Sequence, residues 1–147
     1  MEFILHPIGI IHSPFKDKAS TTIQTSRSQA SGQVVVFPEY AAGLQDLEEF
    51  SHIFLVYIFH CSSGYSLQVK SFLDHNLHGL FATRHPCRPN PIGLSVVKLL
   101  SRVENVLDIS GVDVLDETPL LDIKPYVPDF DTRTCTRTGW YTTRSIE

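Results

Sequence analysis

Polar side chains are gathered in a proline-rich stretch near the middle of the chain. The range Thr83–Ile92 contains Pro86, Pro89 and Pro91, and each proline fixes its own φ and moves the preceding residue away from helical conformation. The stretch is therefore expected to be a stiff, extended loop that holds Arg84, His85, Arg88 and Asn90 at fixed positions. Such a loop suits ligand binding, because little entropy is lost on ordering it. An equally good interpretation is a proline-rich corner with solvated arginines.

Two further groups of residues could take part in chemistry, and each has a plain structural alternative. His60 ends an apolar and aromatic run, so it could face a site or cap a strand. Asp113 and Asp116 could meet a ligand or form an Asx-type turn, which the pattern alone favours. His75 and His78 stand three residues apart with no cluster of cysteines or carboxylates nearby, so no metal site is predicted.

The sequence lacks the motifs of the common nucleotide-binding folds. It contains no nucleophile elbow and no phosphate-binding loop, and none of its eight glycines lies two residues from another. A cofactor site of the Rossmann type is therefore not expected.

Many short strands and little helix are predicted, with a long polar loop at Lys16–Ser31. The strands expected from short apolar or alternating runs are Pro7–His12, Gln33–Phe37, Phe50–His60, Leu67–Phe72, Gly93–Leu100, Val106–Ser110, Val112–Leu115 and Leu121–Pro125. The one helical pattern is Glu39–Phe50. This arrangement predicts a mostly β fold, a small barrel or a sandwich.

Composition fits one domain with a sizeable core, since the chain has 147 residues and 42% of them are hydrophobic. The net charge of -4 gives no global basic field for nucleic acid. His75–Val103 and Thr132–Ile146 nevertheless contain arginines and no acid. The two segments could form a positive face suited to phosphate, or carry unrelated surface charges.

Cysteine usage and apolar runs bear on the compartment. The three cysteines are far apart, and an odd number argues for reduced thiols in the cytoplasm over a disulfide framework. No basic segment opens the chain, so no signal peptide is expected. The longest apolar run, Ile53–Phe59, is too short to span a membrane.

Longer motifs, taken together, resemble those of one known family. They are Ile8–Lys16 (IGIIHSPFK), Phe50–His52, Phe59–His60, Phe81–Arg84, Arg88–Ser95 (RPNPIGLS) and Thr118–Tyr126 (TPLLDIKPY). Over about Ile8 to Asp131 the chain resembles the TsaA-like family, which includes TrmO. The resemblance implies a homodimeric β-barrel that is not of the Rossmann type. It also implies an enzyme that uses S-adenosylmethionine to methylate N6 of threonylcarbamoyladenosine (t6A) beside the anticodon of threonine tRNA.

Site residues follow from the resemblance as well. Cofactor contacts would fall on Thr22, Ile23, Gln24, His60, Cys61, Arg84, Leu94, Asp113, Val114, Leu115 and Asp116. Arg84 would bind the cofactor's carboxylate, and Asp113 or Asp116 would accept from its ribose or amino group. Asp116 or His60 would be the catalytic base if one is needed. The substrate would be held by Arg88, Asn90 and Lys124.

Two positions depart from the family pattern. Thr22 stands where the family usually has proline, and Glu117 stands where it usually has glycine, which adds a carboxylate and removes φ freedom from a turn. Two other functions therefore stay open: a non-catalytic regulatory module that binds S-adenosylmethionine or a nucleotide, and a barrel that binds RNA without the cofactor.

The expected domain organisation is a barrel at 1–131 followed by an Arg-rich tail at 132–147, in place of the second domain of longer family members. In the tail, Trp140 and Tyr141 would be available for stacking on RNA, or would belong to a frayed terminus.

Overall fold

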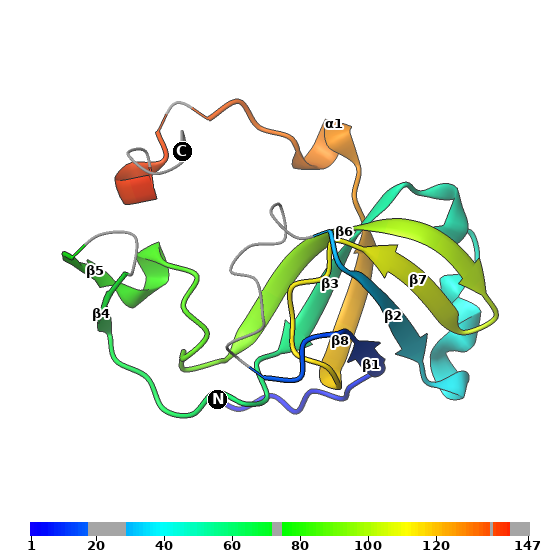
Figure 1. The fold of residues 1–147 in the computed structure, drawn as a ribbon, viewed down its shortest axis with the longest axis horizontal. Helices are drawn as coiled ribbons and strands as arrows, with labels where there is room; N and C mark the ends of the chain where they lie inside the picture. The colour runs from blue at the N-terminus through cyan, green and yellow to red at the C-terminus, as the bar shows by residue number, and fades with distance from the viewer. Residues whose placement is uncertain (18–28, 72–74, 136, 142–147) are drawn as a thin grey trace.

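Six antiparallel strands close into a barrel in the computed structural model, which describes residues 1–17, 29–71, 75–135 and 137–141 (Figure 1). The barrel strands are β1 (Gly9–His12), β2 (Ser31–Val36), β3 (His52–Ile58), β6 (Ile92–Val103), β7 (Val106–Ser110) and β8 (Thr118–Pro125). Around the barrel they follow the order β1-β2-β7-β6-β3-β8. The predicted mostly β fold is confirmed, and of the two predicted architectures, a barrel and a sandwich, the structure forms the barrel.

Alternation of side chains explains why these segments form a barrel. In β3, Ile53, Leu55 and Tyr57 are buried while the residues between them are partly exposed, and β6 alternates in the same way. Successive side chains of a strand point to opposite faces. The inward-facing Ile11, Val34, Ile53, Leu107 and Leu120 are all fully buried and form the centre of the core.

The predicted helix at Glu39–Phe50 is wrong in type. The segment forms two short 3-10 helices, η2 (Pro38–Leu44) and η3 (Leu47–Glu49). Between them Asp46 has a φ of 73°, which no α-helix tolerates. Leu44 and Leu47, two apolar residues of the predicted segment, are nevertheless buried against the barrel.

The predicted strand at Val112–Leu115 is also wrong, because this segment does not join the barrel ladder. Its backbone is bonded to residues that follow β1: the Ser13 hydroxyl donates to the Val114 carbonyl at 2.6 Å, and the Asp116 amide donates to the Phe15 carbonyl at 2.7 Å. The segment is therefore a loop between β7 and β8, with Val112 and Val114 buried as its anchors.

A two-stranded hairpin stands beside the barrel. It pairs β4 (Gln68–Lys70) with β5 (Leu77–Gly79) and leads through η4 (Leu80–Ala82) into the proline-rich loop. Strand β4 lies within the predicted range, but β5 was not predicted, because Leu77–Gly79 has one large apolar residue and so neither an apolar nor an alternating run. After β8 the chain forms α1 (Pro128–Asp131) and η5 (Gly139–Tyr141), and Figure 1 shows this arm running from the barrel back to the hairpin.

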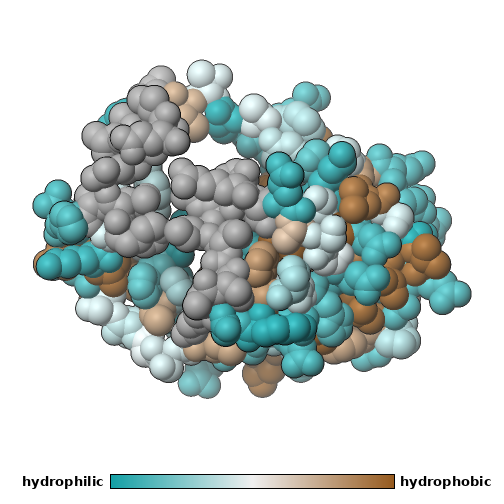
Figure 2. Space-filling view, in the orientation of Figure 1, coloured by the Kyte–Doolittle hydropathy of each residue, from teal (hydrophilic) through white to brown (hydrophobic). Residues whose placement is uncertain are grey.

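The outside of the barrel keeps several large apolar side chains. Leu100 and Val103 of β6 are 52% and 68% exposed, and Figure 2 shows brown apolar patches among the polar ones on the right, over the barrel. In the part of the chain that the structure describes, no helix has the length and apolar character to cross a membrane.

Candidate active site at the loop end of the barrel

One end of the barrel receives nearly all the residues predicted to do chemistry. Because neighbouring strands are antiparallel, the last residues of β1, β3 and β7 meet the first residues of β2, β6 and β8 at the same end, called here the loop end. His60 and Cys61 follow β3, Arg84 to Asn90 precede β6, and Asp113 to Asp116 join β7 to β8. The fold thus brings together three segments that are far apart in sequence.

The proline-rich loop is fastened at both of its ends. At its start, the Thr83 hydroxyl donates to the Leu80 carbonyl at 2.7 Å, and at its end the Pro91 carbonyl accepts from the Phe59 amide at 2.7 Å. Arg88 braces the middle, since its guanidinium donates to the carbonyls of Thr83 (2.9 Å) and His85 (3.1 Å). The predicted loop is present, its stiffness stays a prediction, and the Arg88 guanidinium is bonded within the loop.

A chain of hydroxyl groups connects the barrel interior to Asp113. The Ser95 hydroxyl donates to the Asp113 carboxylate at 3.0 Å, so the Tyr57 hydroxyl, 2.7 Å from Ser95, is the donor to Ser95. Burial raises the pKa of Tyr57, and the charge of Asp113 raises it further, while the hydrogen bond to Ser95 and the positive charge of Arg84 oppose the rise. Tyr57 therefore stays a neutral donor that orients the chain toward Asp113.

Opposite charges face this hydroxyl chain from two loops. The charge of Asp113 raises the pKa of Tyr57 and the charge of Arg84 lowers it, so both groups lie near the Tyr57 hydroxyl. Within the described residues Arg84 forms no salt bridge, and its side chain is exposed. A guanidinium of this kind fits a ligand carboxylate, and Asp113 fits a ligand ammonium or hydroxyl. The two groups together match the carboxylate and ammonium of an amino acid.

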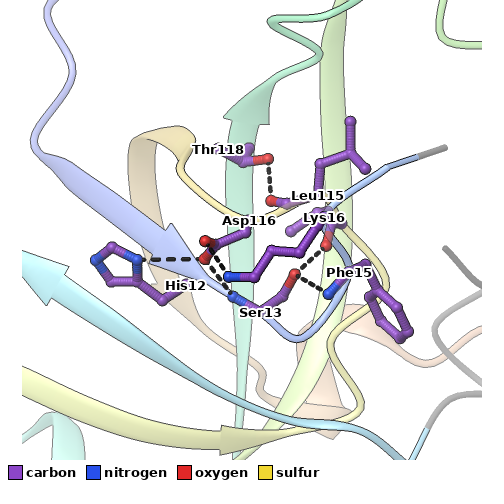
Figure 3. Close-up of polar contacts among 8 residues, drawn as sticks. His12, Ser13, Phe15, Lys16, Leu115, Asp116 and Thr118 are labelled. Atoms are coloured by element: carbon purple, nitrogen blue, oxygen red, sulfur yellow. Dashed lines mark hydrogen bonds and ion pairs between the residues drawn. The ribbon is translucent and has the colours of Figure 1, made fainter. Parts of the chain in front are cut away.

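Asp116 is held by a cluster at the end of β1 (Figure 3). Its carboxylate accepts from the Ser13 amide at 3.0 Å, meets Lys16 Nζ at 2.5 Å and lies 3.3 Å from His12 Nδ1. Chiefly because of the hydrogen bond from Lys16, against a smaller effect of burial, the pKa of Asp116 falls to about 2. Asp116 is thus a stable anion that fastens the β7–β8 loop to β1.

Glu117 follows this anchor in a conformation that favours glycine. Its φ is 66°, and its side chain is exposed. The departure from the family's usual glycine therefore sits at a left-handed position, where a side chain adds strain.

The remaining predicted residues are placed less favourably. Leu94 points outward from β6 and is 58% exposed, while the Val114 side chain is buried in the core, so only its backbone could reach a ligand. Lys124 lies near the far end of β8, opposite Phe54 of β3 and 3.2 Å from the Asp122 carboxylate. Thr22, Ile23 and Gln24 lie outside the described residues.

Tyr57 and Ser95 were missed as site residues. Tyr57 is embedded in an apolar run, and Ser95 is one polar residue in an apolar strand. A signal was present in Gly93, because glycine inside a strand marks a close approach. A Cβ on Gly93 would lie 2.3 Å from the Tyr57 ring.

The described residues gather no three metal-ligating side chains, and their three cysteines are unpaired. His78 is part of β5, and its ring stacks on that of Trp140.

Comparison with known proteins decides the family. The domain described as "tRNA-methyltransferase O N-terminal domain" matches residues 10–132. The chain belongs to the TrmO family. A crystal structure of TrmO from Pseudomonas aeruginosa superimposes with a TM-score of 0.79 at 38% identity, over 95% of this chain and 63% of that one. The resemblance found in the sequence is therefore confirmed.

Two sequence relatives of the TrmO-family chain carry different descriptions. A Pyrococcus abyssi protein, 56% identical over 91% of this chain and 73% of its own length, is described as a "Probable S-adenosyl-L-methionine-binding protein". A Mus musculus protein, 37% identical over 87% of this chain, is described as "tRNA (adenine(37)-N6)-methyltransferase". The chain spans 32% of that mouse protein and 63% of the solved TrmO chain.

Proposed function

We propose that this chain is an S-adenosylmethionine-dependent tRNA methyltransferase that acts on N6 of the adenosine beside the anticodon, with t6A as its substrate. The observation that carries the proposal is that Asp113, which accepts from the Ser95 hydroxyl, and the exposed Arg84, which forms no salt bridge within the described residues, lie on two loops at the same end of the barrel. The names of the mouse relative and of the solved TrmO support the reaction. The name of the Pyrococcus relative supports the cofactor.

The residues of the loop end fit the parts of that cofactor. Arg84 would hold its carboxylate, Asp113 would accept from its ammonium or ribose hydroxyls, and the backbone at Val114 and Leu115 would line its base. When bound, S-adenosylmethionine supplies a methyl group on a sulfonium sulfur, which passes to N6 as its bond to sulfur breaks. The chain's own contribution is to fix both reactants in line, which is the larger part of such catalysis.

Loss of the N6 proton needs little help from the protein. In t6A this nitrogen lies between an aromatic ring and a carbonyl, which makes its proton more acidic than that of an amine. Asp116 is poorly matched to the task, because its pKa of about 2 makes it a weak base. We propose His60, exposed on the turn after β3, as the proton acceptor and Asp116 as the residue that positions the loop. Asn90, exposed on the proline-rich loop, would contact the substrate.

A homodimer remains a proposal, and the outer face of β3 and β6 supports it. The pairs Phe54–Val96 and Val56–Leu94 place four apolar residues side by side on that face. A second copy would cover them, and only across such an interface could Lys124 approach a loop end. Sedimentation equilibrium should give a dimer that Val96→Glu converts to a monomer. A wild-type chain that sediments as a monomer at micromolar concentration contradicts this part of the proposal.

Titration calorimetry with S-adenosylmethionine tests the cofactor site. Wild type should bind, and Arg84→Ala should bind roughly 10- to 100-fold more weakly, because a charged hydrogen bond is lost. Lys98→Ala removes another exposed cation, on the wall of the barrel, and should bind as wild type does. If wild type, Arg84→Ala and Lys98→Ala bind S-adenosylmethionine with equal affinity, Arg84 does not contact the cofactor.

The second function, a binding module without turnover, is favoured by Glu117 at its left-handed position and by the description of the Pyrococcus relative. It predicts cofactor binding by calorimetry but no methyl transfer to any tRNA. A barrel that binds RNA alone would give no calorimetric signal. A cytoplasmic location remains a prediction from the unpaired cysteines.

A further inference from the structure

The C-terminal arm returns to the loop end and is fastened there by Trp140. Strand β8 ends at the opposite end of the barrel, and Figure 1 shows the arm crossing from α1 to the hairpin. The indole Nε1 of Trp140 donates to the Ala82 carbonyl at 2.8 Å. Ala82 immediately precedes the proline-rich loop, so the arm is bonded to the segment that carries Arg84 and Arg88.

Three rings are stacked at this junction, and we name them the ring column. The Trp140 ring lies 4.4 Å from the His78 ring at an angle of 14°, and 4.0 Å from the Tyr141 ring at 27°. Trp140 and Tyr141 remain partly exposed. A column of nearly parallel rings at this spacing has the geometry of stacked bases, which a planar nucleobase can extend or enter.

Arginines without a carboxylate partner lie on the two segments that are joined at the ring column. Among the residues that the structure describes, Arg88 of the proline-rich loop and Arg133 and Arg137 of the arm form no ion pair with a carboxylate. Lys98 on β6 likewise has none, whereas Lys16, Arg102 and Lys124 each lie within 3.2 Å of a carboxylate. The Arg88 guanidinium also lies 5.8 Å from the Phe81 ring, which joins the loop cations to the aromatic surface.

We propose that the ring column of His78, Trp140 and Tyr141, together with Arg88, Arg133 and Arg137 on the segments it joins, binds unpaired nucleotides of RNA. The proposal rests on the proposed function and deepens it, because this surface would hold loop nucleotides beside the adenosine at the active site. Cations attract the phosphates without regard to sequence, and the rings take bases that are not paired. A net charge of -4 then coexists with RNA binding, because the positive surface is local.

The stacked rings and the arginines together favour one kind of ligand. A duplex would meet the arginines but offer no open base to the ring column. An acidic peptide would meet the arginines but has no series of flat rings to stack. Unpaired RNA satisfies both.

Binding of a fluorescent anticodon stem–loop RNA, followed by anisotropy, tests the ring column on the full chain. A paired RNA duplex of equal charge is the second probe. Trp140→Ala should bind the stem–loop roughly 5- to 100-fold more weakly, since the ring that stacks on both His78 and Tyr141 is lost and the column is broken, while its duplex affinity changes little. Tyr40→Ala is the matched control, because Tyr40 is an aromatic residue 42% exposed on η2, away from the arm. It should bind both RNAs as wild type does.

A spectroscopic signal separates stacking from an indirect structural role. A 2-aminopurine placed in the RNA loop should be quenched by wild type and by Trp140→Phe, but not by Trp140→Ala. Thermal unfolding should show the same barrel stability in all variants, since Trp140 lies outside the barrel core.

Three results would overturn the inference: equal stem–loop affinity of Trp140→Ala and wild type, an equal loss for stem–loop and duplex, or tighter binding by Trp140→Ala, which would make the arm a cover. Methyl transfer is measured separately on the same proteins. If Trp140→Ala binds and methylates tRNA as wild type does, only the role of the ring column in RNA binding is refuted. If RNA binding depends on Trp140 but no protein transfers a methyl group, only the proposed methyltransferase activity is refuted.

Discussion

At the scale of single residues, the carboxylates of the β7–β8 loop divide two tasks. Asp113 accepts from the buried hydroxyl chain and faces the same point as Arg84. Asp116 is occupied by Lys16, Ser13 and His12 and has a depressed pKa. The two residues are three apart in the sequence, and only their surroundings in the fold distinguish Asp113, proposed to contact the cofactor, from Asp116, which anchors the loop.

The anchoring role predicts a pH-dependent stability. Asp116→Asn should lower the free energy of unfolding at pH 7 by about 1–3 kcal/mol, because hydrogen bonds to a charged group are lost. The pKa of Asp116 is about 2 in the folded chain and ordinarily 3.8. A carboxyl group whose pKa is lower in the folded chain than in the unfolded chain stabilises the fold at pH values above the unfolded pKa. This stabilisation is lost as the pH falls through the pKa of the folded chain. The difference between variant and wild type should therefore shrink between about pH 4 and pH 2.

Urea unfolding across that pH range measures this effect. Asp108→Asn is the control, since Asp108 accepts from Gln33 and Ser101 on the exposed wall of the barrel and has no cation bonded to it. At pH 7 Asp108→Asn should lower the free energy of unfolding less than Asp116→Asn does. A loss from Asp116→Asn that is the same at pH 7 and pH 2 would contradict the anchoring role.

Glu117 gives a second prediction at this scale. Glu117→Gly should stabilise the chain by roughly 0.5–1 kcal/mol, because glycine adopts a positive φ without strain. Glu104→Gly, at a φ of 55° in the β6–β7 turn, should stabilise to a similar degree. Calorimetry with S-adenosylmethionine separates the two, since only Glu117 lies at the loop end. If Glu117→Gly leaves stability unchanged while Glu104→Gly raises it, strain at Glu117 is excluded.

At the scale of elements, the pairing of β3 with β6 builds the floor of the site. Tyr57 lies opposite Gly93 in this pair, and the absent Cβ of Gly93 leaves room for the Tyr57 ring. Ser95, two residues along β6, then meets both Tyr57 and Asp113. The register of two strands therefore decides where Asp113 is held.

Gly93→Ala should move Tyr57 and weaken the site together with the fold. Its Cβ would lie 2.3 Å from one Tyr57 ring carbon and 2.8 Å from the Phe59 ring. Overpacking of this kind costs about 1–3 kcal/mol, measurable by urea unfolding, and cofactor affinity should fall as the hydroxyl chain is displaced. Gly43→Ala is the control, because no atom lies within 4 Å of its added Cβ. Wild-type stability of Gly93→Ala would disprove the close approach.

Elements differ in how far the sequence could predict them. Strand β3 was predicted because its residues form a short, nearly continuous apolar run, which local sequence carries. The Val112–Leu115 segment is also short and apolar, yet its Val114 carbonyl accepts from Ser13, about a hundred residues away, and its Val112 amide donates to the Ala30 carbonyl. Tyr57 and Ser95 could not be predicted as site residues for a similar reason. Their hydrogen bonds to each other and to Asp113 depend on the register of β3 against β6, which the sequence does not give. The family motifs supplied most of the site, and local patterns alone did not.

At the scale of the whole molecule, charge is separated into regions. The chain carries a net charge of -4, but arginines that form no ion pair among the described residues lie on the proline-rich loop and on the C-terminal arm. Phosphate contacts release counterions, so affinity for tRNA should fall steeply with salt. Replacing one phosphate-binding arginine, for example Arg137→Ala, should reduce the slope of log affinity against log salt by about 1. An unchanged slope would remove Arg137 from the RNA surface.

Methyl transfer from labelled S-adenosylmethionine to tRNA tests the central claim most directly. The substrates are tRNA that carries t6A and the same tRNA prepared without that modification. Wild type and Lys98→Ala should methylate the t6A-bearing tRNA at N6, and Arg84→Ala should lose most of the activity at limiting cofactor. Cofactor binding with no methyl transfer to either tRNA would contradict the account and leave a binding module in its place.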